Sequence, residues 1–132
     1  MSDVRRWRAV AAAMAVGAVY DGVFGISILG FPGLTSRLLG IPLPDDPFYL
    51  HLNGVFLLIL AALYGAAARA PERYRAIPPI AAGGRVLGCA LFTWAFAGGR
   101  PWMFLALGLA DLALALVTLL VWRRATRVAL SD

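Results

Sequence analysis

Four long apolar stretches separated by short polar segments dominate the pattern of this chain. They cover about residues 9–29, 48–68, 79–97 and 102–122. Each is close to the roughly 20 residues that an α-helix needs to cross a hydrocarbon core of about 30 Å. The pattern predicts an all-α fold, an integral membrane four-helix bundle in which residues 1–132 form a single transmembrane domain.

Polar residues and prolines mark where the helices are expected to begin. Asp45–Pro47 precedes the second stretch, placing a carboxylate at the helix N-cap and proline at the first helical position. Pro79 is expected to start the third helix after Ile77-Pro78, and Pro101 marks the start of the fourth. The first stretch follows a basic segment, but it is long and lacks a clear signal-peptide cleavage site. We therefore interpret it as a membrane span.

The distribution of arginine predicts the orientation of the spans. Nine arginines flank the ends that would share one side of the membrane, whereas Arg37 and Arg100 lie on the other side. The positive-inside rule then places both termini in the cytoplasm of a multi-pass protein of the bacterial inner membrane. Residues 30–47 become the one longer outer loop, where residues 31–40 fit a short helical turn that lies on the membrane or caps the bundle. The nine arginines that would lie on the cytoplasmic side are Arg5, Arg6, Arg8, Arg69, Arg73, Arg75, Arg123, Arg124 and Arg127.

Composition supports the membrane class and argues against several others. Hydrophobic residues make up 61% of the chain and charged residues 14%, with a mean hydropathy of +0.80, whereas soluble domains are nearer half apolar and a quarter charged. The net charge of +5 does not indicate a nucleic-acid partner, because the arginines form short clusters beside apolar runs. Cys89 is a single cysteine within a span, and no motif predicts a metal site or a cofactor.

Three ionisable residues, Asp21, Arg85 and Asp111, lie deep within the predicted spans. A helical rise of about 1.5 Å per residue places each of them some 9–18 Å from a span end, close enough to meet near mid-depth. Charges at this depth are costly and normally face protein. Small residues on the same helix faces support that interpretation, because they let helices approach closely. We expect Arg85 to pair with Asp111, Asp21 or both; the neighbours on their faces include Gly17, Gly25, Ala81, Ala82, Gly88, Gly108, Ala115 and Thr118.

The pairing of two acids with one arginine leaves two interpretations open. The pair can simply lock neighbouring helices together, or it can form a binding or proton-active site in a low-dielectric bundle. In either case one carboxylate is expected to remain unpaired and to hold a proton.

Other polar residues near this depth are weaker candidates. His51 lies near the outer start of the second span, where it is solvated at the interface or lines an access route above Asp21. Asn53 more naturally bonds a neighbouring helix than a substrate, and Tyr20 and Tyr64 are expected to serve packing.

Short motifs in three spans resemble those of the DoxX-like type of small four-helix bacterial membrane proteins and related uncharacterised families. They are Tyr20-Asp21-Gly22-x-Phe24-Gly25, Gly84-Arg85-x-x-Gly88 and Leu109-Ala110-Asp111. The resemblance implies the four-helix architecture. Some DoxX-type proteins are linked to quinone-dependent sulfur oxidation, but no motif in this chain is specific enough to transfer that activity.

Three functional hypotheses follow. The preferred one is a non-catalytic accessory or assembly subunit, embedded in the bilayer beside membrane-protein partners or further copies of itself. The second is a binder or carrier of a small lipophilic or anionic molecule at the buried Arg/Asp site, which predicts a pocket that touches Arg85. The third is an intramembrane isomerase or a quinone-linked redox enzyme that uses an aspartic acid.

Overall fold

The chain forms five α-helices in the residues that the structure describes. The computed structural model describes the backbone of residues 3–129 and the side chains of residues 6–127, so the side chain of Arg5 lies outside it. The helices are α1 (Asp3–Gly30), α2 (Pro32–Leu39), α3 (Phe48–Arg69), α4 (Ile77–Ala97) and α5 (Met103–Ala129). All except α2 are long and apolar enough to cross a membrane. The protein is therefore a small all-α integral membrane protein with four candidate spans.

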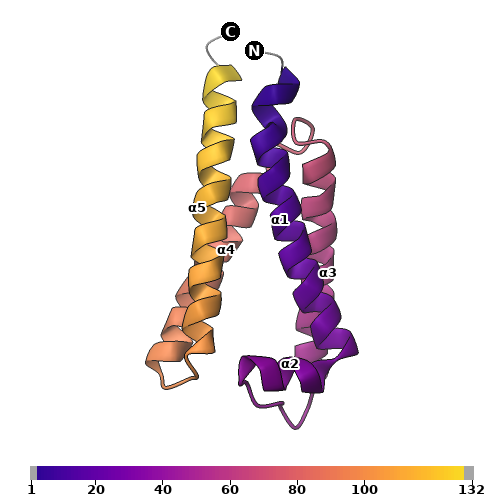
Figure 1. The fold of residues 1–132 in the computed structure, drawn as a ribbon, viewed down its shortest axis with the longest axis vertical. Helices are drawn as coiled ribbons and strands as arrows, with labels where there is room; N and C mark the ends of the chain where they lie inside the picture. Colours follow the sequence, from indigo (N-terminus) through magenta and orange to yellow (C-terminus); the bar gives the residue numbers. More distant parts are fainter. Residues whose placement is uncertain (1–2, 130–132) are drawn as a thin grey trace.

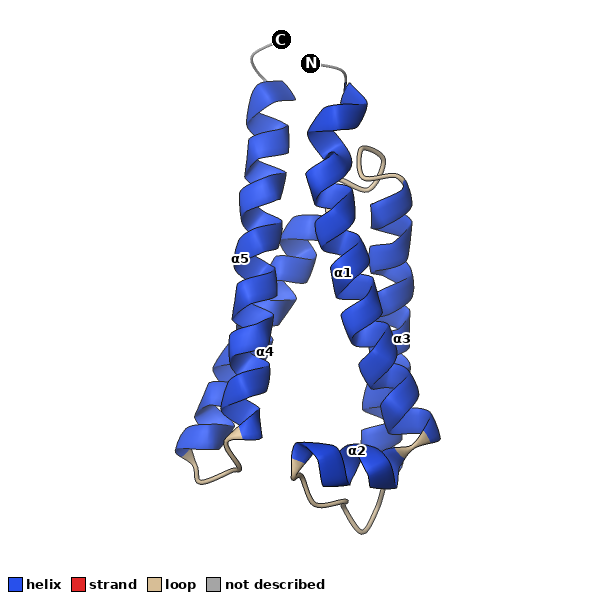
Figure 2. Cartoon of the chain, in the orientation of Figure 1, coloured by secondary structure: helices blue, strands red, loops and turns tan. Residues whose placement is uncertain are grey.

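The four long helices are arranged as two pairs. α1 packs mainly against α3, and α4 packs mainly against α5, while α1 and α5 make the chief contact between the pairs. The start of α1 and the end of α5 lie at the same end of the molecule, and the pairs diverge towards the opposite end (Figure 1). The short helix α2 lies across that opposite end (Figure 2). The bundle is therefore closed at one end and spread apart at the other.

A compact apolar core fills the closed end. Its largest fully buried side chains include Trp7, Val10 and Met14, which α1 contributes from its first half. All four long helices supply members of this cluster, so it holds the two pairs together at this end. The buried members are Trp7, Val10, Met14, Tyr64, Ala67, Ala81 and Ala125.

Glycines bring α1 and α3 into close contact. A Cβ at Gly54 would lie 2.8 Å from Leu29 Cγ, and one at Gly25 would lie 3.0 Å from the carbonyl oxygen of Gly54. Small residues that let two helix backbones approach are the usual basis of helix association in lipid, where the hydrophobic effect between helices is weak. This contact explains why α1 pairs with α3.

The connection between α1 and α3 contains the helical turn that the sequence suggested. α2 covers Pro32–Leu39 and ends at Gly40, which adopts a left-handed conformation with φ of 64°. Thr35 Oγ1 donates a hydrogen bond to the carbonyl oxygen of Ser27, at 2.9 Å, and thereby attaches α2 to the end of α1. Phe31, at the N-cap, and Leu34 and Leu38 within α2 are exposed. α2 therefore presents apolar side chains on its exposed surface.

Three helix starts differ by one or two residues from the sequence prediction. α5 begins at Met103 rather than at Pro101. Pro47 precedes the first residue of α3 rather than occupying the first helical position, while Asp46 Oδ1 accepts a hydrogen bond from the Phe48 N–H at 3.0 Å. α4 begins at Ile77, with Pro78 and Pro79 inside its first turn. The first-turn N–H groups of a helix have no intrahelical acceptor, so prolines there remove no hydrogen bond.

Candidate functional site

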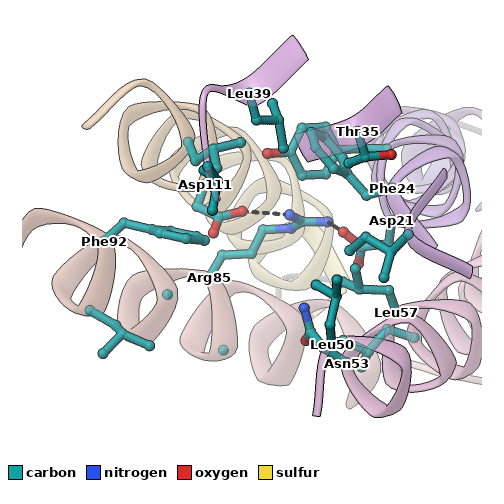
Figure 3. A pocket seen from close by; sticks show the side chains of 18 of the residues that line it. Asp21, Phe24, Thr35, Leu39, Leu50, Asn53, Leu57, Arg85, Phe92 and Asp111 are labelled. Atoms are coloured by element: carbon teal, nitrogen blue, oxygen red, sulfur yellow. Dashed lines mark hydrogen bonds and ion pairs between the residues drawn. The ribbon is translucent and has the colours of Figure 1, made fainter. Parts of the chain in front are cut away.

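Arg85 bridges both buried aspartates. Its Nη1 donates a hydrogen bond to Asp111 Oδ1 at 2.8 Å, and its Nη2 donates one to Asp21 Oδ1 at 3.0 Å. Figure 3 shows the guanidinium lying between the two carboxylates. Asp21 is 3% exposed, Arg85 7% and Asp111 9%, so all three are largely shielded by protein. We call these three residues, which come from α1, α4 and α5, the ionic cluster.

Two tyrosine rings complete the surroundings of the guanidinium. Arg85 Cζ lies 5.2 Å from the centroid of the Tyr20 ring and 5.6 Å from that of the Tyr64 ring. Cations over tyrosine faces at such distances are attracted by the negative face of the ring. The sequence predicts a packing or interfacial-belt role for Tyr64, but its ring lies directly beside the guanidinium. Its signal was its neighbours on the α3 face, Ala61 and Ala67, which mark a face that packs closely against protein.

Two glycines make room for the ionic cluster. A Cβ at Gly17 would lie 3.4 Å from Arg85 Nη2 and 3.4 Å from Tyr64 Cδ2. A Cβ at Gly88 would lie only 2.7 Å from Asp111 Oδ2, closer than real Cβ contacts come. The small residues on these helix faces therefore leave space for charged groups, in addition to allowing helices to approach.

The prediction that one carboxylate would be left without a partner is wrong. The two ends of the guanidinium are far enough apart for Arg85 to bind one oxygen of each carboxylate. Among the described residues, the second oxygens of Asp21 and Asp111 have no hydrogen-bond partner. Neither oxygen is fully buried. Each aspartate therefore retains a free acceptor.

A cavity of about 720 Å³ lies between the diverging helix pairs and reaches the ionic cluster. Asp21, Arg85 and Asp111 line it at mid-depth, and α2 with residues 41–44 lines it at the end opposite the termini. Most of the remaining wall is apolar, and Figure 3 shows several of these side chains around the cluster. They include Phe24, Ile28, Leu39, Leu50, Leu57, Leu60, Leu63, Ile77, Ile80, Leu91, Phe92 and Leu107.

The cavity extends along the seam between α3 and α4. These two helices make few contacts with each other. Leu60, Leu63, Ile80 and Leu91 line the cavity from the two sides of this seam, and each is more than a third exposed. The seam is therefore an exposed apolar strip between two candidate membrane spans.

The weaker candidates from the sequence separate into two groups. Tyr20 and Asn53 line the cavity together with the ionic cluster, and the side chain of Asn53 is drawn beside Leu50 and Leu57 in Figure 3. His51 is half-buried and does not line the cavity. It lies two positions from Asn53 on the same helix, and successive positions of this spacing face different directions.

No protein-family model matches the chain, nor does any curated protein or solved structure. The resemblance to DoxX-like proteins therefore rests on the short motifs alone. The chemistry of the site therefore has to be inferred from its geometry. The cavity has the size of a small ligand and a mainly apolar wall, and its charged and polar groups converge at one place on that wall.

Proposed function

We propose that this small four-span membrane protein binds a lipophilic molecule in the cavity, with the polar group of that molecule at the ionic cluster. The observation that carries the proposal is that one cavity is lined both by the apolar seam between α3 and α4 and by Asp21 and Asp111, each of which has a free carboxylate oxygen. Small-molecule sites typically measure about 300–1,000 Å³ and combine an apolar lining with a few placed polar groups.

A purely structural role for the ionic cluster explains less of the molecule. Locking α4 to α1 and α5 requires only that Arg85 reach Asp21 and Asp111, and the small residues around the cluster already allow a compact bundle. A purely structural role gives no reason for a cavity beside the charges, because the side chains that line a cavity lose packing contacts. A bound lipophilic molecule restores those contacts and shields the cluster from the bilayer.

Photoaffinity labelling tests the proposal. The full chain in phosphatidylcholine nanodiscs is exposed to a photoactivatable analogue of dodecanol, and labelled residues are mapped by peptide mass spectrometry. We expect labels on cavity-lining residues such as Leu57 and Leu91, and competition by unmodified dodecanol.

Two neighbouring glycines supply a matched pair of variants. Gly84 lines the cavity, whereas Gly83 does not, and a Cβ at either position meets nothing within 4 Å. Gly84→Leu should therefore place its side chain in the cavity and reduce labelling of the lining, whereas Gly83→Leu should leave it unchanged. Labelling that is restricted to lipid-facing residues, or that responds equally to both substitutions, would contradict the proposal.

Assembly with a membrane-protein partner or a second copy is a second candidate, consistent with the accessory-subunit hypothesis. The observation that favours it is the sparse contact between α3 and α4, which leaves an apolar seam that a transmembrane helix could cover instead of a ligand. Cross-linking from a photoreactive residue at Ile80 distinguishes the two: a protein adduct of defined mass supports assembly, and adducts with lipophiles alone support ligand binding.

Catalysis would use the same two aspartates, and no described group beyond them favours a particular reaction. The intramembrane isomerase and quinone-linked redox hypotheses therefore add no step to this proposal. His51 does not line the cavity.

We further propose the orientation in which the end of the bundle that contains the start of α1 and the end of α5 faces the cytoplasm. The start of α1 and the end of α5 share one side (Figure 1), and nine of the twelve basic residues flank that side. The positive-inside rule supports this direction of insertion.

A further inference from the structure

With both aspartates ionised, the ionic cluster has an excess of negative charge. Two carboxylates and one guanidinium give a formal charge of −1, because Asp21 and Asp111 each contribute −1 and Arg85 contributes +1. No other acidic or basic residue lines the cavity among those that the structure describes. A net charge at mid-depth in a bilayer is costly unless a partner of opposite sign compensates it.

Each carboxylate of the cluster has a free hydrogen-bond acceptor. Each carboxylate uses Oδ1 for Arg85 and has no partner among the described residues for Oδ2. Asp111 Oδ2 occupies the space that the missing side chain of Gly88 leaves, which fixes where that acceptor lies. A ligand group that donates hydrogen bonds therefore suits this part of the wall.

The guanidinium is poorly placed to receive an anion. Two of the five N–H groups of Arg85, one on each Nη atom, donate to the flanking carboxylates, and the rings of Tyr20 and Tyr64 lie within 6 Å of Cζ. An anionic ligand would have to displace an aspartate or lie beside two like charges, and like charges at close range repel strongly in a medium of low dielectric constant. This argues against the anionic ligands that the sequence left open.

From these observations we infer that the ligand class is a lipophilic amine, with a protonated amino group at the ionic cluster and a hydrocarbon chain in the cavity. The inference rests on the proposed function, because it names the ligand of the same site. The ammonium group compensates the charge of −1 and donates hydrogen bonds to Asp21 and Asp111, while the chain follows the leucine-rich seam between α3 and α4.

Competition among ligands with the same tail tests this inference. Dodecylamine, dodecanol and dodecanesulfonate are titrated against the photoactivatable dodecanol in nanodiscs of phosphatidylcholine, a lipid without net charge. We expect dodecylamine to compete at about tenfold lower concentration than dodecanol, because hydrogen bonds to charged groups contribute more than neutral ones. Dodecanesulfonate should be the weakest competitor.

Variants of the cluster separate recognition from membrane partitioning. Asp111→Asn removes one negative charge while it keeps an oxygen for Arg85, so the preference for dodecylamine over dodecanol should fall about tenfold towards equality. Each competitor partitions into the bilayer equally in wild type and variant, so this ratio reports the site alone.

A second pair of variants keeps every charge. Gly88→Ala should displace Asp111 Oδ2 and weaken competition by dodecylamine several-fold, whereas Gly83→Ala, which meets nothing within 4 Å, should have no effect. This pair tests the acceptor position even if Asp111→Asn lowers the yield of folded protein.

The outcomes distinguish this inference from the proposed function. If the photoactivatable alcohol fails to label the cavity, both fall. If it labels the cavity but dodecylamine competes no better than dodecanol in wild type, or dodecanesulfonate competes best, lipophile binding stands and the amine assignment is overturned.

Discussion

Arg85 of α4 donates a hydrogen bond to Asp21 of α1 at 3.0 Å, and this ion pair joins the two helix pairs at the wall of the cavity between them. The bond from Arg85 to Asp111, in contrast, lies within the α4–α5 pair. One side chain thus fixes the geometry within a pair and the spacing between pairs. The packed core lies towards the closed end of the bundle, and the cavity lies between the diverging helix pairs.

Loss of Arg85 should destabilise the bundle strongly. Arg85→Met leaves Asp21 and Asp111 without their shared cation, and breaking a buried ion pair by removing one partner costs about 3–5 kcal/mol. Unfolding titrations in mixed micelles measure the change. The triple variant Asp21→Asn, Arg85→Met and Asp111→Asn should recover much of the loss, because no charge remains buried. Equal instability of the single and triple variants would show that Arg85 acts through packing rather than charge.

The close contact between α1 and α3 should tolerate no side chain at Gly54. A Cβ there would lie 2.8 Å from Leu29 Cγ and 3.1 Å from Ile28 Cγ2, so Gly54→Ala should lower the free energy of unfolding by about 1–3 kcal/mol through overpacking. Gly65→Ala on the same helix meets nothing within 4 Å and serves as the control. It should be neutral or slightly stabilising, because alanine favours helix over glycine. The same unfolding titration compares the two, and a Gly54→Ala variant as stable as Gly65→Ala would argue against this helix contact.

A tryptophan hydrogen bond helps to close the end of the bundle that carries the termini. Trp122 Nε1 donates to the carbonyl oxygen of Arg75 at 3.0 Å, and Arg75 Cζ lies 5.2 Å from the Trp7 ring centroid. Trp122→Phe removes the donor and should cost about 1 kcal/mol. Trp102→Phe provides the comparison, since Trp102 is 68% exposed. Thermal denaturation followed by circular dichroism should give a lower midpoint temperature for Trp122→Phe than for Trp102→Phe. The reverse order would count against a role for this bond.

Cysteine accessibility checks the proposed orientation. Asp45 and Glu72 are exposed and lie in the connections that precede α3 and α4. In a Cys89→Ala background, Asp45→Cys should react with an impermeant maleimide added to intact cells. Glu72→Cys should react only after the membrane is permeabilised. The opposite pattern would invert the orientation, and equal labelling of both positions in intact cells would contradict the four-span arrangement.

The positions of the polar groups along the spans could be predicted from the sequence. The depths of Asp21, Arg85 and Asp111 follow from helical rise alone, and the small residues on their faces indicated burial. Gly17, Gly25, Ala81, Ala82, Gly108 and Ala115 are indeed buried. Helical periodicity is local, so it assigns a face to each residue without knowledge of the partner helix.

The partner of each face could not be predicted in this way. Nothing local indicated that α1 would pair with α3 through Gly25 and Gly54, or that Tyr64 would reach Arg85. His51 and Asn53 lie at similar depth in the sequence prediction. Only Asn53 lines the cavity in the structure.

The sequence by itself determined the membrane class, the four spans and the mid-depth level of the three charged residues, because transfer free energies and helical rise act residue by residue. Only the tertiary structure decided that the two helix pairs diverge, that Arg85 contacts both acids, and that a cavity opens beside them. Those features depend on the shapes of side chains from different helices, and van der Waals contact between helices is what chooses their partners in lipid.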